Sequence, residues 1–168
     1  MKKIILVLFT VLMSCVLITG CSLVFIDSKE EYTAVYSFSG SNEQFAISNG
    51  SILLSDTESV FRGGNFEEKS DTFRDIVSYS MTFYIISGEE KVVILSNVVE
   101  DLTGQPVHLS GEIGTITVED IPPKFFTSNP QNWKNNLCFE LKTIDSNQKE
   151  TVYQLSLSVA EITDKNQH

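Results

Sequence analysis

The stretch IVSYSMTFYII, residues 76–86, decides the fold class. Its apolar side chains alternate with hydroxyl side chains, so that one face carries Val77, Tyr79, Met81, Phe83 and Ile85 and the other carries Ser78, Ser80 and Thr82. A period of two residues is typical of a strand with one buried and one solvated face, which is the situation in an antiparallel sheet. We therefore expect a long strand here.

The same period recurs outward along the chain, in YTAVYSF (residues 32–38) and in TVYQLSLSVA (residues 151–160). Shorter apolar runs predict further strands at 59–62, 91–96, 114–118 and 137–144. No stretch of a dozen residues has an apolar stripe of period 3.6, so we expect at most single helical turns, around 73–77 or 97–102.

Turn residues separate these runs. In FAISNGSILLS, residues 45–55, Asn49-Gly50 lies between two apolar segments, which predicts a β-hairpin. Many short strands at regular spacing favour an all-β, antiparallel β-sandwich of about eight or nine strands. We expect one domain over residues 32–163 and a disordered tail at 164–168.

The first twenty residues have the three-part arrangement of a secretory signal peptide. Lys2 and Lys3 are followed by an apolar run over residues 4–18, and the small pair Thr19-Gly20 precedes Cys21. We therefore predict that residues 1–20 are removed and that the mature chain begins at Cys21, followed by a tether over residues 21–31.

The string Ile18-Thr19-Gly20-Cys21 resembles the lipobox of bacterial lipoproteins. The resemblance covers only this segment. It implies a diacylglyceryl group on the Cys21 thiol and a protein anchored to the cell membrane on its extracytoplasmic side. Two acyl chains hold a protein stably, whereas one holds it reversibly. The chain is similar in general character to the small surface lipoproteins of Gram-positive bacteria.

Two alternatives stay open for this segment. Leu12-Met13-Ser14-Cys15 is a second, poorer lipobox, which would shorten the apolar run. Residues 4–26 also form an almost continuous apolar segment, long enough for an uncleaved spanning helix of about 23 residues. Both membrane anchors place the domain outside the cytoplasm.

Charge restricts the partners. Without residues 1–20 the chain keeps 10 basic and 22 acidic residues, a net charge of −12. This balance argues against a nucleic-acid partner, because phosphates would repel it. If Cys21 is lipidated, Cys138 is the one remaining thiol. We expect Cys138 to be a buried, unreactive side chain rather than a nucleophile, since no His lies near it in sequence.

Motifs for catalysis or metal binding are weak, and we expect no catalytic residues, metal or cofactor. His108 and His168 lack ligand spacing, and Ser110 beside His108 lacks a third group for acyl transfer. Glu67, Glu68, Asp71 and Asp75 form an acidic segment that could hold Ca²⁺, although solvated ion pairs explain it as well. The carboxyl pairs Glu67-Glu68, Glu89-Glu90 and Glu119-Asp120 are sequence neighbours, which rarely face each other across a cleft.

The segment DIPPKFFTSNPQNWKNN, residues 120–136, carries three of the four prolines and the one tryptophan. Rigid aromatic side chains on such a loop favour a contact surface, so Phe125, Phe126 and Trp133 are the candidate contact residues. They would equally serve to plug the open end of the sandwich.

We therefore expect a non-catalytic binding module whose partner is another envelope protein, a wall polymer or a small molecule. The alternatives are a hydrolase that uses carboxylates or Ca²⁺, and a carbohydrate-binding sandwich. The latter would stack sugars on exposed aromatic rings, for which the candidates are Tyr32, Tyr36, Tyr84 and Trp133.

Overall fold

A computed structural model describes residues 34–55, 58–101, 103–119 and 134–163. By its internal contacts the chain divides into two units, Met1–Glu30 and Glu31–His168, and all of the described residues belong to the second. Cys21, Phe125, Phe126 and Trp133 lie outside the described residues, as do the proposed signal peptide and tail.

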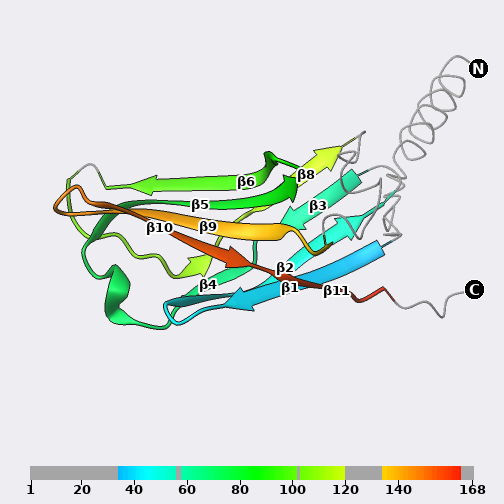
Figure 1. Cartoon of the computed structure of the whole chain (residues 1–168), viewed down its shortest axis with the longest axis horizontal. Helices are drawn as coiled ribbons and strands as arrows, with labels where there is room; N and C mark the ends of the chain where they lie inside the picture. Colours follow the sequence, from blue (N-terminus) through cyan, green and yellow to red (C-terminus); the bar gives the residue numbers. More distant parts are fainter. Residues whose placement is uncertain (1–33, 56–57, 102, 120–133, 164–168) are drawn as a thin grey trace, which may run out of the picture. The chain divides into compact units, whose positions relative to one another are not determined.

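The second unit is built from two antiparallel sheets (Figure 1). The seven-stranded sheet has the order β11-β1-β2-β3-β8, with β4 beside β2 and β7 beside β4. Its strands are β1 (Ala34–Ser41), β2 (Phe45–Leu54), β3 (Glu58–Arg62), β4 (Asn65–Glu68), β7 (Gly111–Glu112), β8 (Thr115–Glu119) and β11 (Ser158–Glu161). The four-stranded sheet has the order β10-β9-β5-β6 and consists of β5 (Ile76–Ser87), β6 (Glu90–Glu100), β9 (Leu137–Asp145) and β10 (Glu150–Ser156).

The inner faces of the two sheets meet in a phenylalanine-rich core. Phe38 and Phe61 of the larger sheet stack with their ring centroids 5.1 Å apart, and both rings contact Phe83 of the smaller sheet edge-on. Phe45 and Phe139 extend this contact along the sandwich at 5.7 Å. Burial of such rings, each worth about 1.5–3 kcal/mol, is what joins the sheets. The predicted all-β sandwich is confirmed.

Residues 76–86 lie in β5 and keep their alternation at Met81, Phe83 and Ile85, but the partner strand β6 is irregular. Phe83 pairs with Leu95 and Tyr84 pairs with Val93, so β6 carries one extra residue, Ile94, at a β-bulge. The bulge changes which residues of β6 face outward. Glu89 lies in the tight turn between β5 and β6, as expected for a hairpin tip.

Two local expectations were wrong. The helical turn considered at 97–102 does not form, because β6 continues as a strand to Glu100. The turn near residue 73 is a short 3₁₀ helix at Asp71–Phe73, slightly earlier than expected, and it places Phe73 in the core.

The predicted hairpin at Asn49-Gly50 was also wrong, because β2 runs straight through both residues. The chain reverses instead between β1 and β2, at residues 42–44. There the Asn42 side-chain oxygen accepts hydrogen bonds from the amides of Gln44 and Phe45. Asn49 does adopt the left-handed conformation that the motif favours, with φ 57°. Here that conformation produces a bulge within a strand, not a reversal of the chain.

Candidate functional site

The bulge in β2 shapes the outer face of the seven-stranded sheet. Phe38 pairs with Gly50 and Gly40 pairs with Ile47, so Ser48 and Asn49 together oppose Ser39 of β1. On the other side of β2 the pairing changes from β4 to β3 at the same point. Gly64, with φ 76°, allows this change, because a Cβ there would lie 2.2 Å from the Ser48 carbonyl oxygen. Bulges of this kind re-aim side chains and often border binding sites.

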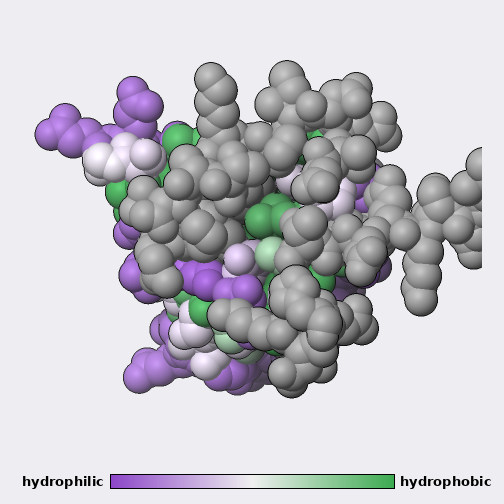
Figure 2. Space-filling model, turned by 90° about the vertical axis from the view of Figure 1, so that its right-hand side faces the viewer, coloured by the Kyte–Doolittle hydropathy of each residue, from purple (hydrophilic) through white to green (hydrophobic). Residues whose placement is uncertain are grey.

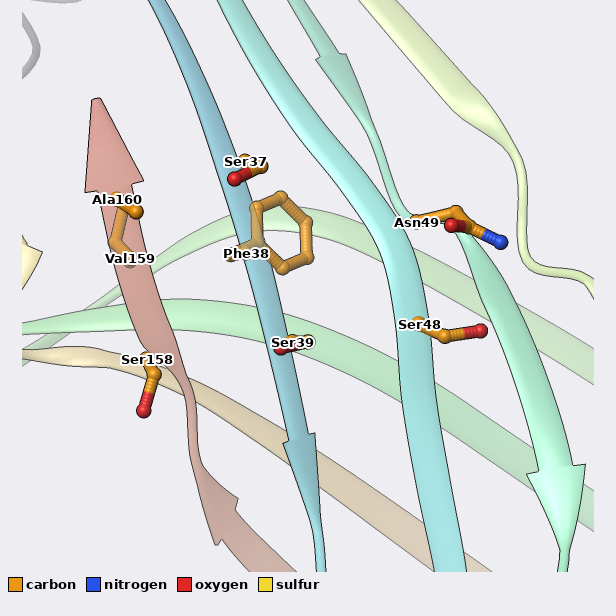
Figure 3. A pocket seen from close by; sticks show the side chains of 8 residues that line it. All are labelled: Ser37, Phe38, Ser39, Ser48, Asn49, Ser158, Val159 and Ala160. Carbon is orange, nitrogen blue, oxygen red and sulfur yellow. The ribbon is translucent and has the colours of Figure 1, made fainter. Parts of the chain in front are cut away.

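A shallow pocket of about 430 Å³ opens at this bulge (Figure 3). Its lining comes from three neighbouring strands, β11, β1 and β2, and consists of Ser37, Phe38, Ser39, Ser48, Asn49, Ser158, Val159 and Ala160. Ser39 lies directly opposite Ser158 in the β1–β11 pair. Phe38 and Val159 belong to the inward faces, so the polar side chains supply the functional groups of this pocket.

These polar groups are available for a ligand. Within the described part of the chain, no hydrogen bond to protein involves the side chains of Ser37, Ser39, Ser48, Asn49 or Ser158. All five are partly or fully exposed. They offer four hydroxyls and one amide, which are neutral groups that both donate and accept hydrogen bonds. The pocket is therefore suited to a neutral ligand with hydroxyl or amide groups and has no charged group of its own.

A second pocket, of about 340 Å³, adjoins the 3₁₀ helix and includes Asp71 and Asp75, two of the four acidic residues considered for Ca²⁺; Glu67 and Glu68 lie on β4 and do not line it. Asp71, Asp75 and Asp145 all line it, but Arg74 and Lys149 line it too. Asp71 forms an ion pair with Arg74. The Asp145 carboxylate accepts hydrogen bonds from the amides of Asn147 and Lys149. Among the described residues, no group of three or more His, Cys, Asp or Glu side chains is placed to hold a metal ion.

The outer face of the four-stranded sheet carries a third cluster, around Tyr84. The Lys91 ammonium lies 4.0 Å from the centre of the Tyr84 ring and donates a hydrogen bond to Glu140 at 2.9 Å. Gln154 donates a second bond to the same carboxylate oxygen at 3.0 Å. The bond from Lys91 is the main reason why the pKa of Glu140 is lowered. Burial raises the pKa of Tyr84, and the neighbouring Cys138 and Glu140 raise it further.

The structure corrects the expectation for Cys138. This residue pairs with Tyr84 and Ser156 on the outer face and is half-buried, so it is not a core side chain. The prediction failed because Leu137, Cys138 and Phe139, at the start of residues 137–144, are all apolar. Their sequence therefore does not indicate which face of the strand is buried. The thiol lies beside Tyr84, a neighbour in space that is 54 positions away in sequence.

The other candidates do not assemble into a site. His108 and Ser110 are both exposed, and the Tyr79 hydroxyl donates a hydrogen bond to the backbone carbonyl of His108. Of the proposed sugar-stacking rings, Tyr36 is 3% exposed and Tyr84 is 5% exposed. Lysines cover both rings, Lys134 over Tyr36 and Lys91 over Tyr84. Tyr32 and Trp133 lie outside the described residues.

The segment carrying Phe125, Phe126 and Trp133 begins after β8 and ends before β9. Both strands reach the same end of the sandwich (Figure 1). Figure 2 views the molecule from that end, where described hydrophobic residues are visible near the centre of the face.

The fold and the pocket define an antiparallel β-sandwich with a neutral polar pocket on one sheet face. No protein-family model matches the chain, and no similar curated protein or solved structure was found. No helix among the described residues is long and apolar enough to cross a membrane.

Proposed function

We propose that this protein is a lipid-anchored, extracytoplasmic binding module without catalytic activity, tethered through Cys21. The observation that carries the binding role is the pocket at the β2 bulge, where five polar side chains have no hydrogen-bond partner in the described protein. The anchoring role is supported by the signal-like N-terminus and its lipobox.

The chemistry of the pocket favours a neutral polymer of the cell envelope as the ligand. Hydroxyl and amide groups recognise partners of the same kind, and a glycan bearing N-acetyl groups presents both. The pocket is shallow and lined by short side chains, so each contact contributes about 0.5–1.5 kcal/mol at most. We therefore expect weak binding to single sugars and tighter binding to longer chains. An envelope protein docking through polar loops is the alternative partner.

No observation favours catalysis over binding. Within the part of the chain that the structure describes, the two carboxyls with displaced pKa values, Asp101 and Glu140, both have lowered values. A proton donor in a hydrolase needs the opposite direction. Asp101 owes its lowered pKa first to a hydrogen bond from the Thr103 hydroxyl, then to the backbone amides of Thr103 and Gln105.

The test is a titration of the isotopically labelled protein with N-acetylglucosamine oligosaccharides, followed by amide chemical shifts. We expect shifts concentrated at Ser39, Asn49 and Ser158. A Ser158→Trp variant should fill the pocket and abolish the shifts. Ser156→Trp is the matched control, because Ser156 is equally exposed but lies on the outer face of the other sheet.

Shifts that are absent, or that Ser156→Trp removes as effectively as Ser158→Trp does, would contradict the assignment of the pocket to this ligand. Phe125, Phe126 and Trp133 remain proposed as additional contacts. Shifts at these three residues, beside those at the pocket, would extend the contact surface to their loop.

A further inference from the structure

The edge of the four-stranded sheet formed by β6 differs from every other described edge. Strand β6 has eleven residues, whereas the other edge strands, β7, β8, β10 and β11, have two, five, seven and four. It is hydrogen-bonded to β5 alone. None of the backbone hydrogen bonds formed by described residues outside the regular pairs reaches its other side.

Natural sheets protect such edges, and the protection of β6 is limited to the bulge at Ile94 and the charges at its two ends. Residues 92–99, VVILSNVV, contain no charge, no proline and no glycine. Val93 is 52% exposed and Val98 is 66% exposed. Proteins normally place lysine, proline or a short strand at an open edge, because unpaired backbone groups there recruit another strand. A long apolar edge strand is therefore a surface for strand addition.

We propose that β6 pairs antiparallel with β6 of a second copy, joining the two four-stranded sheets into one continuous sheet. The occupant is a second copy because the strand is complementary to itself. It carries Glu90 and Lys91 at one end and Glu100 at the other, with an apolar centre, and Lys91 also bonds Glu140 of its own chain. Antiparallel pairing about a two-fold axis brings opposite ends together, so Lys91 and Glu100 meet twice.

The bulge at Ile94 restricts the register. Residues paired directly across two antiparallel strands must share a face. Before the bulge the outward residues are Lys91 and Val93, and after it they are Ser96, Val98 and Glu100. Outward residues of β6 therefore have odd numbers before the bulge and even numbers after it. When the first half of one β6 pairs with the second half of the other, the two residue numbers in each pair must therefore add up to an odd number.

Two odd sums, 189 and 191, give equal overlaps of ten residues, and charge decides between them. A sum of 189 places Lys91 opposite Val98 of the second copy and leaves Glu100 unpaired. A sum of 191 leaves Glu90 unpaired but places Lys91 opposite Glu100 of the second copy and Val93 opposite Val98 of the second copy, so we assign this register. In this register the paired residues lie on opposite faces only at the two-fold axis, next to the bulge. There Leu95, which faces inward, is opposite Ser96, which faces outward. A sum of 190 would place Glu90 opposite Glu100 and would put mismatched faces together along the strand. Because one strand pair buries little area, we expect a weak dimer that is favoured when the copies are concentrated.

Disulfide crosslinking of the full chain in membranes tests the register. In a Cys138→Ser background, the double variant Val93→Cys, Val98→Cys should form a dimer on mild oxidation, and each single variant should not. Directly paired strand residues have Cα atoms about 4.5–5.5 Å apart, within disulfide range. The two positions of one copy lie about 17 Å apart along the strand and cannot bridge internally.

The matched control replaces Val98→Cys by Val152→Cys. Val152 is 48% exposed on β10, the opposite edge of the same sheet, and should give no dimer. A second test uses charge. Glu100→Lys should lower the crosslinking yield several-fold, and Glu90→Lys should leave it unchanged. Absence of the dimer in the double variant, or equal dimer from the Val152 control or the single variants, would overturn the proposal, provided thermal unfolding shows the variants folded.

Discussion

The ring of Phe38 packs directly onto Gly50, its partner across the β1–β2 pair. A Cβ at position 50 would lie 2.1 Å from a ring carbon of Phe38, closer than real Cβ atoms come to any neighbour. Phe61 and Phe83 hold the ring in place from the other sides. The bulge that forms the pocket and the core that joins the sheets therefore meet at this one contact.

Gly50→Ala should destabilise the protein by about 1–3 kcal/mol, the usual cost of forcing extra volume into a packed core. The ring of Phe38 cannot move aside without displacing Phe61 and Phe83. Urea unfolding followed by circular dichroism measures the effect.

Gly104→Ala is the control for glycine replacement as such. Gly104 has φ 75° and open space around it, so alanine there suffers only backbone strain, about 1–2 kcal/mol at most. A Gly50→Ala protein as stable as the unaltered chain would show that the Phe38 contact is looser than described.

The left-handed backbone at Asn49 gives a second prediction. Asn49→Gly should keep or slightly raise stability, because glycine adopts φ 57° without a steric cost. Asn49→Val should lower the free energy of unfolding by about 1–2 kcal/mol, since a β-branched residue is strongly disfavoured there. The comparison is made by thermal unfolding. Equal stability of the two variants would mean that β2 lacks the bulge.

Protonation should loosen the turn after β6. The lowered pKa of Asp101 arises from its bonds to Thr103 and Gln105, so the folded turn favours the charged carboxylate. Its contribution is present above the ordinary carboxyl pKa of about 3.9 and is lost as the pH falls through the lower folded value. Amide shifts of Thr103 and Gln105 should report this transition, and Asp101→Asn should remove it. A transition above pH 4 would contradict the described bonds.

Trp133→Ala distinguishes the two roles of the segment after β8. We predict that the variant keeps the melting temperature of the unaltered protein within a few degrees and binds its ligand more weakly, as a contact residue should. A fall of ten degrees or more, with binding lost only through unfolding, would instead identify Trp133 as a plug. Phe73→Ala, which removes a ring known to be in the core, calibrates the destabilised case.

Much of the fold was predictable because burial follows local patterns. The alternation in residues 76–86 fixed the inner face of β5 at Met81, Phe83 and Ile85. Asn49-Gly50 was misread because a left-handed residue serves both a hairpin and a bulge, and only the neighbouring strands decide between them. The neighbours here are β4 and β3, which exchange places at Gly64.

The pocket itself was not predictable. Ser39, Ser48 and Ser158 come from three strands, and each alone looks like an ordinary solvated position of an antiparallel sheet. Their meeting depends on the order β11-β1-β2, in which the last strand of the chain lies beside the first. Alternation within one strand carries no information about which strands become neighbours.

The mass of the mature protein extracted from membranes shows whether Cys21 carries the lipid anchor. We predict a chain that begins at Cys21 and carries the added mass of a diacylglyceryl group, and a Cys21→Ser variant that lacks this mass. A full-length chain with an unmodified Cys21 thiol would contradict the account of a lipid-anchored module.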